Sequence, residues 1–333
     1  MGLAVSDVAV VIVSHNGEGC IRGALDSITG ERSVRQVIVV DNASEDRTRE
    51  IVRAVPGAKL VENERNVGFG MGHARCLERL QDEVRFLFLL NQDARVLPGA
   101  IDGLRDAALG LPAYAVLSPL HLEAPGGPLD GPFAQFGLRD KQRFLTADSL
   151  HGALKRVYEV SFVPAAAWLV RRDVFVALGG FSRAFQQYGE DMQFCQRVAM
   201  AGLKVGVCPK SEVVHLRASD QDESARRLSE RRRRRGGAIL EVMNPARSLA
   251  RAVLSLAVRS CGEVLSQLLA RRISAAVDTG WSLLAVLTRL PRLAGFRSRE
   301  LELVLECRAK QQDRQRTGQP QDLDRRPPHL PDR

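Results

Sequence analysis

The sequence lacks several patterns that would assign a function directly. Its six cysteines include no C-x-x-C pair, so a zinc site is disfavoured, and they read as small core residues in a reducing compartment. We find no apolar stretch of the roughly 18 residues that a membrane span requires, because "ISAAVDTGWSLLAVLTRL" is interrupted by Asp278 and Gly280. No basic segment precedes the first apolar run, which therefore predicts a strand rather than a signal peptide. These absences favour a cytoplasmic protein.

Basic residues are in excess. The 48 Lys and Arg residues outnumber the 39 Asp and Glu residues, which gives a net charge of +9 and a pI near 9.7. This charge points to anionic partners, namely phosphates, nucleic acid or an acidic membrane surface. With 333 residues, 45% of them hydrophobic, the chain is long enough for one large domain and an appendage.

Strand and helix patterns alternate along the first hundred residues or so. Strands are predicted at 8–13, 36–40, 58–63 and 85–90, and a helix pattern follows each of the first three. Ser44 is a plausible N-cap for the second of these helices. The alternation predicts an α/β fold with a Rossmann-like, mostly parallel sheet flanked by helices.

The second half gives weaker patterns. The chain between about 112 and 150 is rich in Pro and Gly, which predicts a long loop. A short helix is expected from Arg172 to the Gly179-Gly180 stop, and a later strand carries His215 at its end. A lone histidine at a strand end is usually structural, and only neighbouring ligands would make it functional.

Polar side chains follow each of the four predicted strands. Because the carboxyl ends of parallel strands meet at one edge of a sheet, we expect these side chains to line one crevice. The carboxylate of Asp93 could hold Mg²⁺ or Mn²⁺ on a diphosphate, and a turn role is the alternative. The polar residues at these strand ends are Ser14, His15 and Asn16, then Asp41 and Asn42, then the stretch from Asn63 to Asn66, and finally Asn91 and Asp93.

The glycine stretch "GFGMGH" does not match the dinucleotide fingerprint G-x-G-x-x-G. Counted from Gly68, the pattern requires a glycine where the chain has His73, and the stretch follows the third strand rather than the first. A tight loop and a close helix start explain these glycines more simply.

Two adjacent carboxylates, Glu190 and Asp191, stand where "GEDMQFCQRVAMAG" begins a helix. In the first turn they would be stabilised by the helix dipole, by roughly 0.3 to 1 kcal/mol. No Lys or Arg stands between Arg183 and Arg197 to pair with them. An ionised Asp191 would suit a base that deprotonates a hydroxyl, so capping and proton abstraction both remain open.

Six motifs occur in one order between residues 7 and 220: "VVIVSHNG", "VIVVDNASEDRTRE", "NERNVGFGMGHARC", "LFLLNQDARVLPGAI", "LVRRDVFVALGGFSRAFQQYGEDMQFCQRVAMAGLKV" and "EVVHLRAS". Together they resemble the family 2 glycosyltransferases of the GT-A fold. They look most like the bacterial rhamnosyltransferase-like branch that builds cell-surface glycans. The resemblance covers the C-terminal third poorly.

The resemblance implies an inverting transfer of rhamnose or a similar sugar from a nucleotide diphosphate donor to an acceptor hydroxyl. The acceptor would be a cell-surface glycan, a glycolipid or a lipid-linked precursor. Asp93 and His215 match the metal site for Mg²⁺ or Mn²⁺, Asp191 matches the catalytic base, and Glu190 beside it would contact a sugar. The residues implied to bind the donor are Ser14, Asn16, Asp41, Asn42, Asn66, Gly68 and Asn91.

The resemblance also divides the chain. Residues 1–118 would form the nucleotide-sugar-binding half of the GT-A domain, and 119–220 its acceptor-binding and catalytic half. A basic amphipathic helical extension is expected at 221–307, and a disordered tail at 308–333. Departures such as Gln92, where the family commonly has proline, leave the donor sugar open.

The basic stretch "RRLSERRRRRGG" has three interpretations: a solvated helix packed on the catalytic domain, attachment to the anionic inner face of the plasma membrane, or nucleic-acid binding. Nucleic acid is disfavoured because no aromatic residues interleave with the arginines. A catalytically inactive nucleotide-sugar-binding scaffold is the alternative to an enzyme. A nucleotidyltransferase is disfavoured, since no Gly-rich, basic phosphate loop follows the first strand.

Overall fold

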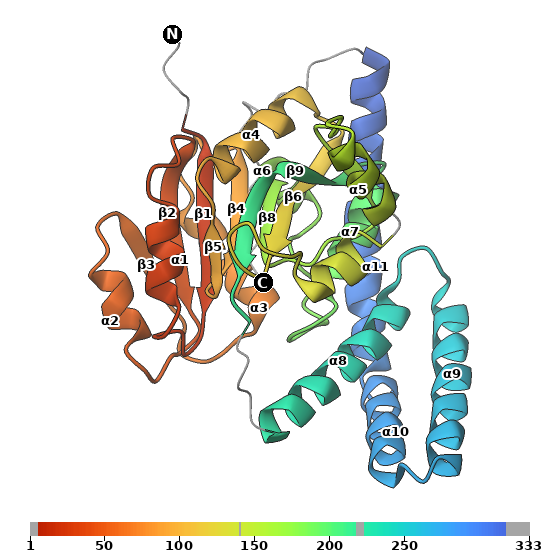
Figure 1. Cartoon of the computed structure of the whole chain (residues 1–333). Helices are drawn as coiled ribbons and strands as arrows, with labels where there is room; N and C mark the ends of the chain where they lie inside the picture. The colour runs from red at the N-terminus through yellow and green to blue at the C-terminus, as the bar shows by residue number, and fades with distance from the viewer. Residues whose placement is uncertain (1–5, 140, 218–222, 318–333) are drawn as a thin grey trace.

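The computed structural model describes residues 6–139, 141–217 and 223–317 (Figure 1). Within these residues the strands form one nine-stranded sheet, in the order β3-β2-β1-β4-β8-β6-β9-β5, with β7 paired to β9. Helices cover the sheet, and the four C-terminal helices extend beyond it, with a long hairpin standing away from the sheet (Figure 1).

The first four strands form the parallel half of the sheet, as the sequence predicts. Alternate residues of β1 belong to different cores: Val8 and Ile12 pack on one face, while Ala9 and Val11 pack on the other. A strand buried on both faces is expected to be apolar at every position, which explains the continuous run. The strands are β1 Val8–Ser14, β2 Val34–Asp41, β3 Ala58–Glu62 and β4 Phe86–Asn91.

The second half of the sheet is mixed, and the loop predicted between 112 and 150 is wrong. The interior strand β6 (Tyr114–Leu122) and the helix α5 (Gln142–Leu150) lie within that stretch. The other strands are β5 Ala94–Val96, β7 Tyr158–Val160, β8 Ala167–Arg171 and β9 Lys204–His215. β8 is antiparallel to both β4 and β6, and β6 is parallel to β9.

Most helices of the sheet domain follow the predicted order. They are α1 Ile21–Ser27, α2 Thr48–Arg53, α3 Phe69–Cys76 with a 3₁₀ turn Leu77–Arg79, α4 Ala100–Gly110, α6 Arg172–Ala177 and α7 Glu190–Met200. Ser44 does not cap α2, contrary to the prediction. The cap position is Arg47, and the Ser44 hydroxyl donates to Asp41 instead.

The C-terminal extension consists of α8 Glu223–Met243, α9 Leu249–Leu269, α10 Ile273–Leu287 and α11 Leu290–Thr317. α8, α9 and α10 enclose a small third core together with Phe185 and with Leu293 of α11, and α11 returns along α6, α7 and α8. α11 continues past residue 307, so the tail predicted to start at 308 is helical up to Thr317. The rest of the predicted tail lies outside the described residues.

One described helix, α9, is long and apolar enough to cross a membrane, with a mean hydropathy of 1.3 over its best window. The expectation that no stretch of the chain reaches this length is therefore wrong. Length and composition alone are weak evidence for a span, because helices packed in soluble proteins can also meet them.

Candidate active site

A cavity of about 530 Å³ opens at the carboxyl ends of β1, β2 and β4. The parallel register sets Ser14 beside Asp41 and brings Asn91 level with the end of β1, so the predicted convergence of strand ends is confirmed. Of the predicted site residues, those that line the cavity are Ser14, Asn42, Asn66, Gly68, Asn91 and Asp93. Those that do not line it are Asn16, Asp41, Glu190, Asp191 and His215.

Asp41 and Asn16 do not line the cavity but stabilise the loops at its edge. The buried Asp41 carboxylate accepts hydrogen bonds from the Ser44 hydroxyl at 2.5 Å and from the Ser44 backbone N–H at 2.9 Å. The Ser44 oxygen in turn accepts from the backbone N–H of Asn16, which has a φ of 49°. These contacts hold the loops after β1 and β2 together.

Gln92 braces the loop after β1, a role that the sequence did not reveal. Its Oε1 accepts from the Ser14 hydroxyl at 2.6 Å and from the His15 backbone N–H at 3.0 Å. The glutamine that departs from the family pattern therefore orients Ser14 at the cavity wall.

Gly68 joins the two halves of the domain at the cavity. Its φ is 87°, and a Cβ there would collide with the backbone carbonyl of Gln186, so a side chain is excluded on both grounds. The Gly68 N–H donates to the Asn66 side chain at 2.9 Å, and Asn42 donates to the Gly68 carbonyl at 3.1 Å. Asn42 and Asn66 therefore hold the loop that precedes α3.

Asp93 and His215 come together, although 122 positions of sequence separate them. β5 pairs with β9 so that the His215 Nε2 lies 3.4 Å from the Asp93 carboxylate. His215 is buried, whereas the Asp93 side chain is 33% exposed and faces the cavity.

Two further residues, His121 and Asp130, lie behind this pair. His121, Asp130 and His215 place one nitrogen or oxygen atom each within 4.8 Å of one another, and all three are buried. Asp130 also accepts two hydrogen bonds from Arg217, at 2.5 and 2.9 Å. Burial, followed by the proximity of His215, lowers the pKa of His121 to about 3, so the His121 imidazole is neutral. Neither residue was predicted from the sequence, because both lie in the stretch between 112 and 150 that was expected to be a loop.

These groups fit a divalent metal ion. His215 presents its Nε2 to the partly exposed Asp93 carboxylate, and its buried Nδ1 has no hydrogen-bond partner among the described residues. A carboxylate suits Mg²⁺ or Mn²⁺, and an imidazole beside it is more compatible with Mn²⁺.

Glu190 and Asp191 begin α7 behind Gly189, but the stabilisation expected from the helix dipole does not dominate. Burial raises the pKa of Asp191, even though Asp191 accepts backbone hydrogen bonds from Met192 and Ala165. Burial, followed by the nearby Asp191 charge, raises the pKa of Glu190 to about 8. One Glu190 oxygen lacks a hydrogen-bond partner within the described part of the chain.

Asp191 does not line the cavity, but Ala165 and Ala166, which precede β8, connect it to Asn91 at the cavity wall. Ala165 donates to Asp191, and the carbonyl of the next residue, Ala166, accepts from the Asn91 N–H at 2.9 Å. Adjacent residues therefore fix Asp191 and Asn91, a connection that no sequence pattern indicated.

The C-terminal extension forms the wall of the cavity opposite the strand ends. Arg232, Arg235 and Gly236 of α8 and Arg289 after α10 line the same cavity as Asp93. A Cβ on Gly236 would collide with the Tyr188 carbonyl, so this glycine lets α8 approach the loop before α7. The basic segment thus contributes to the site, which the sequence alone left undecided.

The mixed sheet, with a polar crevice at the ends of its parallel half, is that of the GT-A fold. Solved structures agree. A mannosyltransferase from Pyrobaculum calidifontis in complex with GDP-Man and Mn²⁺ matches with a TM-score of 0.50 at 21% identity, covering 91% of this chain and 86% of that one. GalNAc-T7 with UDP, GalNAc and Mn²⁺ matches with a TM-score of 0.53 at 16% identity, and 47% of that chain is covered.

Sequence comparison identifies the family. The model of glycosyl transferase family 2 matches residues 9–179, and the chain belongs to this family. The chain is 27% identical over 216 residues to the N-acetylglucosaminyl-diphospho-decaprenol L-rhamnosyltransferase of Mycobacterium tuberculosis, covering 58% of this chain and 69% of that protein. It is 22% identical over 236 residues to rhamnosyltransferase WbbL of Escherichia coli K12, covering 64% and 84% respectively. The predicted membership of the rhamnosyltransferase-like branch is confirmed.

Proposed function

We propose that this glycosyltransferase uses a divalent metal to move a sugar, rhamnose or similar, from a nucleotide diphosphate donor to an acceptor hydroxyl with inversion. The acceptor would belong to a cell-surface glycan, a glycolipid or a lipid-linked precursor. The observation that carries the proposal is the Asp93 and His215 pair beside a cavity formed by the strand ends.

Asp93 and His215 would hold Mg²⁺ or Mn²⁺. When bound, such an ion stabilises the negative charge of the leaving diphosphate by several kcal/mol. Arg232, Arg235 and Arg289 face the same cavity and would add positive charge around the phosphates.

Asp191 would take the proton of the acceptor hydroxyl. Its raised pKa makes it a stronger base than an exposed aspartate, and a positioned carboxylate contributes about 10² to 10⁴ in rate. With a pKa of about 8, Glu190 is mainly protonated at neutral pH and can donate a hydrogen bond to a sugar oxygen. A single base acting opposite the leaving group gives one displacement and therefore inversion.

The printed names of the relatives support the substrate classes. One relative is described as transferring L-rhamnose to N-acetylglucosaminyl-diphospho-decaprenol, and the solved neighbours hold GDP-Man or UDP with Mn²⁺. For this chain we infer a lipid-linked acceptor and a place at the cytoplasmic face of a membrane.

Donor turnover with Mg²⁺ or Mn²⁺ tests this function. Asp93→Ala and Asp191→Asn should each lower kcat by at least about 10²-fold, whereas Asp106→Asn, an exposed control on α4, should not. Full activity in both site variants would refute the assigned roles. Calorimetric donor binding without turnover on a panel of acceptors would favour the inactive scaffold instead.

A further inference from the structure

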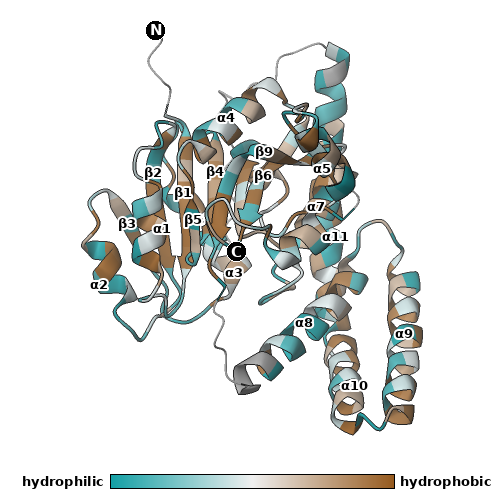
Figure 2. Cartoon of the chain, in the orientation of Figure 1, coloured by the Kyte–Doolittle hydropathy of each residue, from teal (hydrophilic) through white to brown (hydrophobic). Residues whose placement is uncertain are grey.

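The α9–α10 hairpin exposes a stripe of large apolar side chains along each of its helices. On α9, Leu254 and Val258 lie two positions, or about 200° around the helix, from the buried Ala252 and Leu256. Figure 2 shows hydrophobic residues along both helices of the hairpin. The ten side chains are 39% to 77% exposed, and they are Leu254, Val258, Leu265, Leu268, Leu269, Ile273, Val277, Trp281, Leu284 and Leu287.

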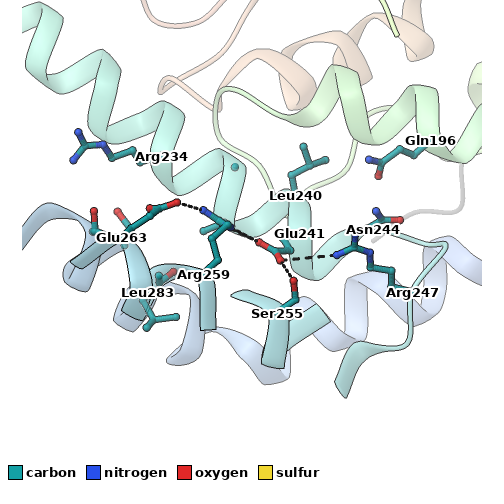
Figure 3. Close-up of a pocket in the computed structure, with 15 residues that line it drawn as sticks. Gln196, Arg234, Leu240, Glu241, Asn244, Arg247, Ser255, Arg259, Glu263 and Leu283 are labelled. Atoms are coloured by element: carbon teal, nitrogen blue, oxygen red, sulfur yellow. Dashed lines mark hydrogen bonds and ion pairs between the residues drawn. The ribbon is translucent and has the colours of Figure 1, made fainter. Parts of the chain in front are cut away.

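The opposite face of the hairpin is fixed to α8 by polar contacts. Figure 3 shows Glu241 of α8 at the centre of this network, where it accepts from Ser255 at 2.5 Å and from Arg259 at 2.7 Å. Arg231 of α8 forms an ion pair with Asp278 of α10 at 3.0 Å. α9 binds α8 through these polar contacts as well as through the buried Leu256, so it cannot cross a bilayer as a lipid-surrounded helix without breaking the polar pairs.

The net positive charge of the C-terminal extension favours an anionic surface over a second copy of the chain as the partner of the apolar stripes. The extension from 223 to 317 holds 20 Lys and Arg residues but nine Asp and Glu residues. A second copy would bring the same positive charge to the contact, whereas an anionic surface would be attracted by it. Arg271 and Arg272, both exposed, form the turn of the hairpin among the apolar side chains. Arginine beside exposed leucine and tryptophan is typical of helices at a lipid interface.

We propose that the α9–α10 hairpin is an interfacial anchor, which inserts its apolar side chains among the headgroups of an anionic bilayer. α8 both binds the hairpin and lines the cavity with Asp93, so the anchor holds the site beside the lipid surface. The proposal deepens the function above and rests on it in one respect: a lipid-linked acceptor would present its diphosphate at that surface.

Vesicle sedimentation of the full chain tests the anchor without donor or metal. The chain should bind phosphatidylcholine vesicles that contain phosphatidylglycerol, and Leu265→Ser combined with Leu269→Ser and Trp281→Ser should weaken binding by at least about tenfold. Leu305→Ser, at an exposed leucine of α11, is the matched control and should bind as the wild type does. Arg271→Gln with Arg272→Gln should weaken binding at low salt and have little effect at high salt.

Tryptophan fluorescence provides a second readout. The chain has two tryptophans, and Trp168 is buried in the sheet domain, so a blue shift on adding vesicles reports on Trp281. Unchanged vesicle binding by the triple variant would refute the proposed anchor. The proposal would also be refuted if the wild type binds no vesicles and forms a dimer, and the triple variant is a monomer. Turnover of a soluble acceptor in the absence of vesicles tests the proposed glycosyltransferase activity separately from membrane binding. The triple variant should retain this activity.

Discussion

Replacing Glu190 by glutamine is expected to make the free energy of unfolding less dependent on pH. Burial and the neighbouring Asp191 raise the pKa of Glu190 from 4.5 to about 8 in the folded chain. Between these values the folded state keeps a proton that the unfolded state has lost, so wild-type stability falls as pH rises. Glutamine resembles the protonated side chain and has no proton to lose.

The size of this change in the free energy of unfolding follows from the difference between the two pKa values of Glu190, 4.5 and about 8. One pKa unit corresponds to about 1.4 kcal/mol, so the Glu190 contribution between pH 5 and pH 8 is roughly 4 kcal/mol as an upper limit. Glu190→Gln should therefore match the wild type near pH 5 and exceed its stability near pH 8. Burial raises the pKa of Asp191 as well, so Asp191 adds to the pH dependence in the same direction in both proteins.

Urea unfolding at several pH values between 5 and 8 measures this difference. Glu306→Gln, at an exposed position of α11, serves as the control and should keep the wild-type pH dependence. Parallel stability curves for the wild type and Glu190→Gln would refute the inference that Glu190 is buried and protonated at neutral pH.

Two further changes test how the site is supported. Gly68→Ala should lower the free energy of unfolding by at least about 1 kcal/mol and weaken donor binding, because Gly68 has a positive φ and a Cβ there would collide with the Gln186 carbonyl. Urea unfolding measures the first effect and calorimetry the second, and wild-type values in both would contradict the close approach. Asp7→Asn should lower the free energy of unfolding by about 3 kcal/mol, because it breaks a buried ion pair with Arg105. The control Asp106→Asn should lower it by less than about 1 kcal/mol. Equal melting temperatures for the two variants would contradict this difference.

Much of the sheet and part of the site follow from the sequence. The apolar runs predict β1, β4 and the end of β2 because these residues are buried on both faces, and a two-faced strand admits few polar residues. β3 lies at the edge of the sheet, and its residues are only partly buried or exposed. The polar residues that follow these runs predict the rim of the cavity, since parallel strands end at one edge. The family motifs add the pairing of Asp93 with His215, which the structure brings to 3.4 Å.

Tertiary structure alone decided the rest. β6 was missed because proline and glycine dominate the residues around it, although long-range pairing with β8 and β9 makes it an interior strand. His121 and Asp130 join His215 through that pairing, and no local pattern encodes it. The protonation of Glu190 depends on burial by distant segments, which outweighs the dipole of its own helix. Local sequence determined which segments form strands and helices, whereas contacts between remote segments determined the surroundings, and hence the chemistry, of each side chain.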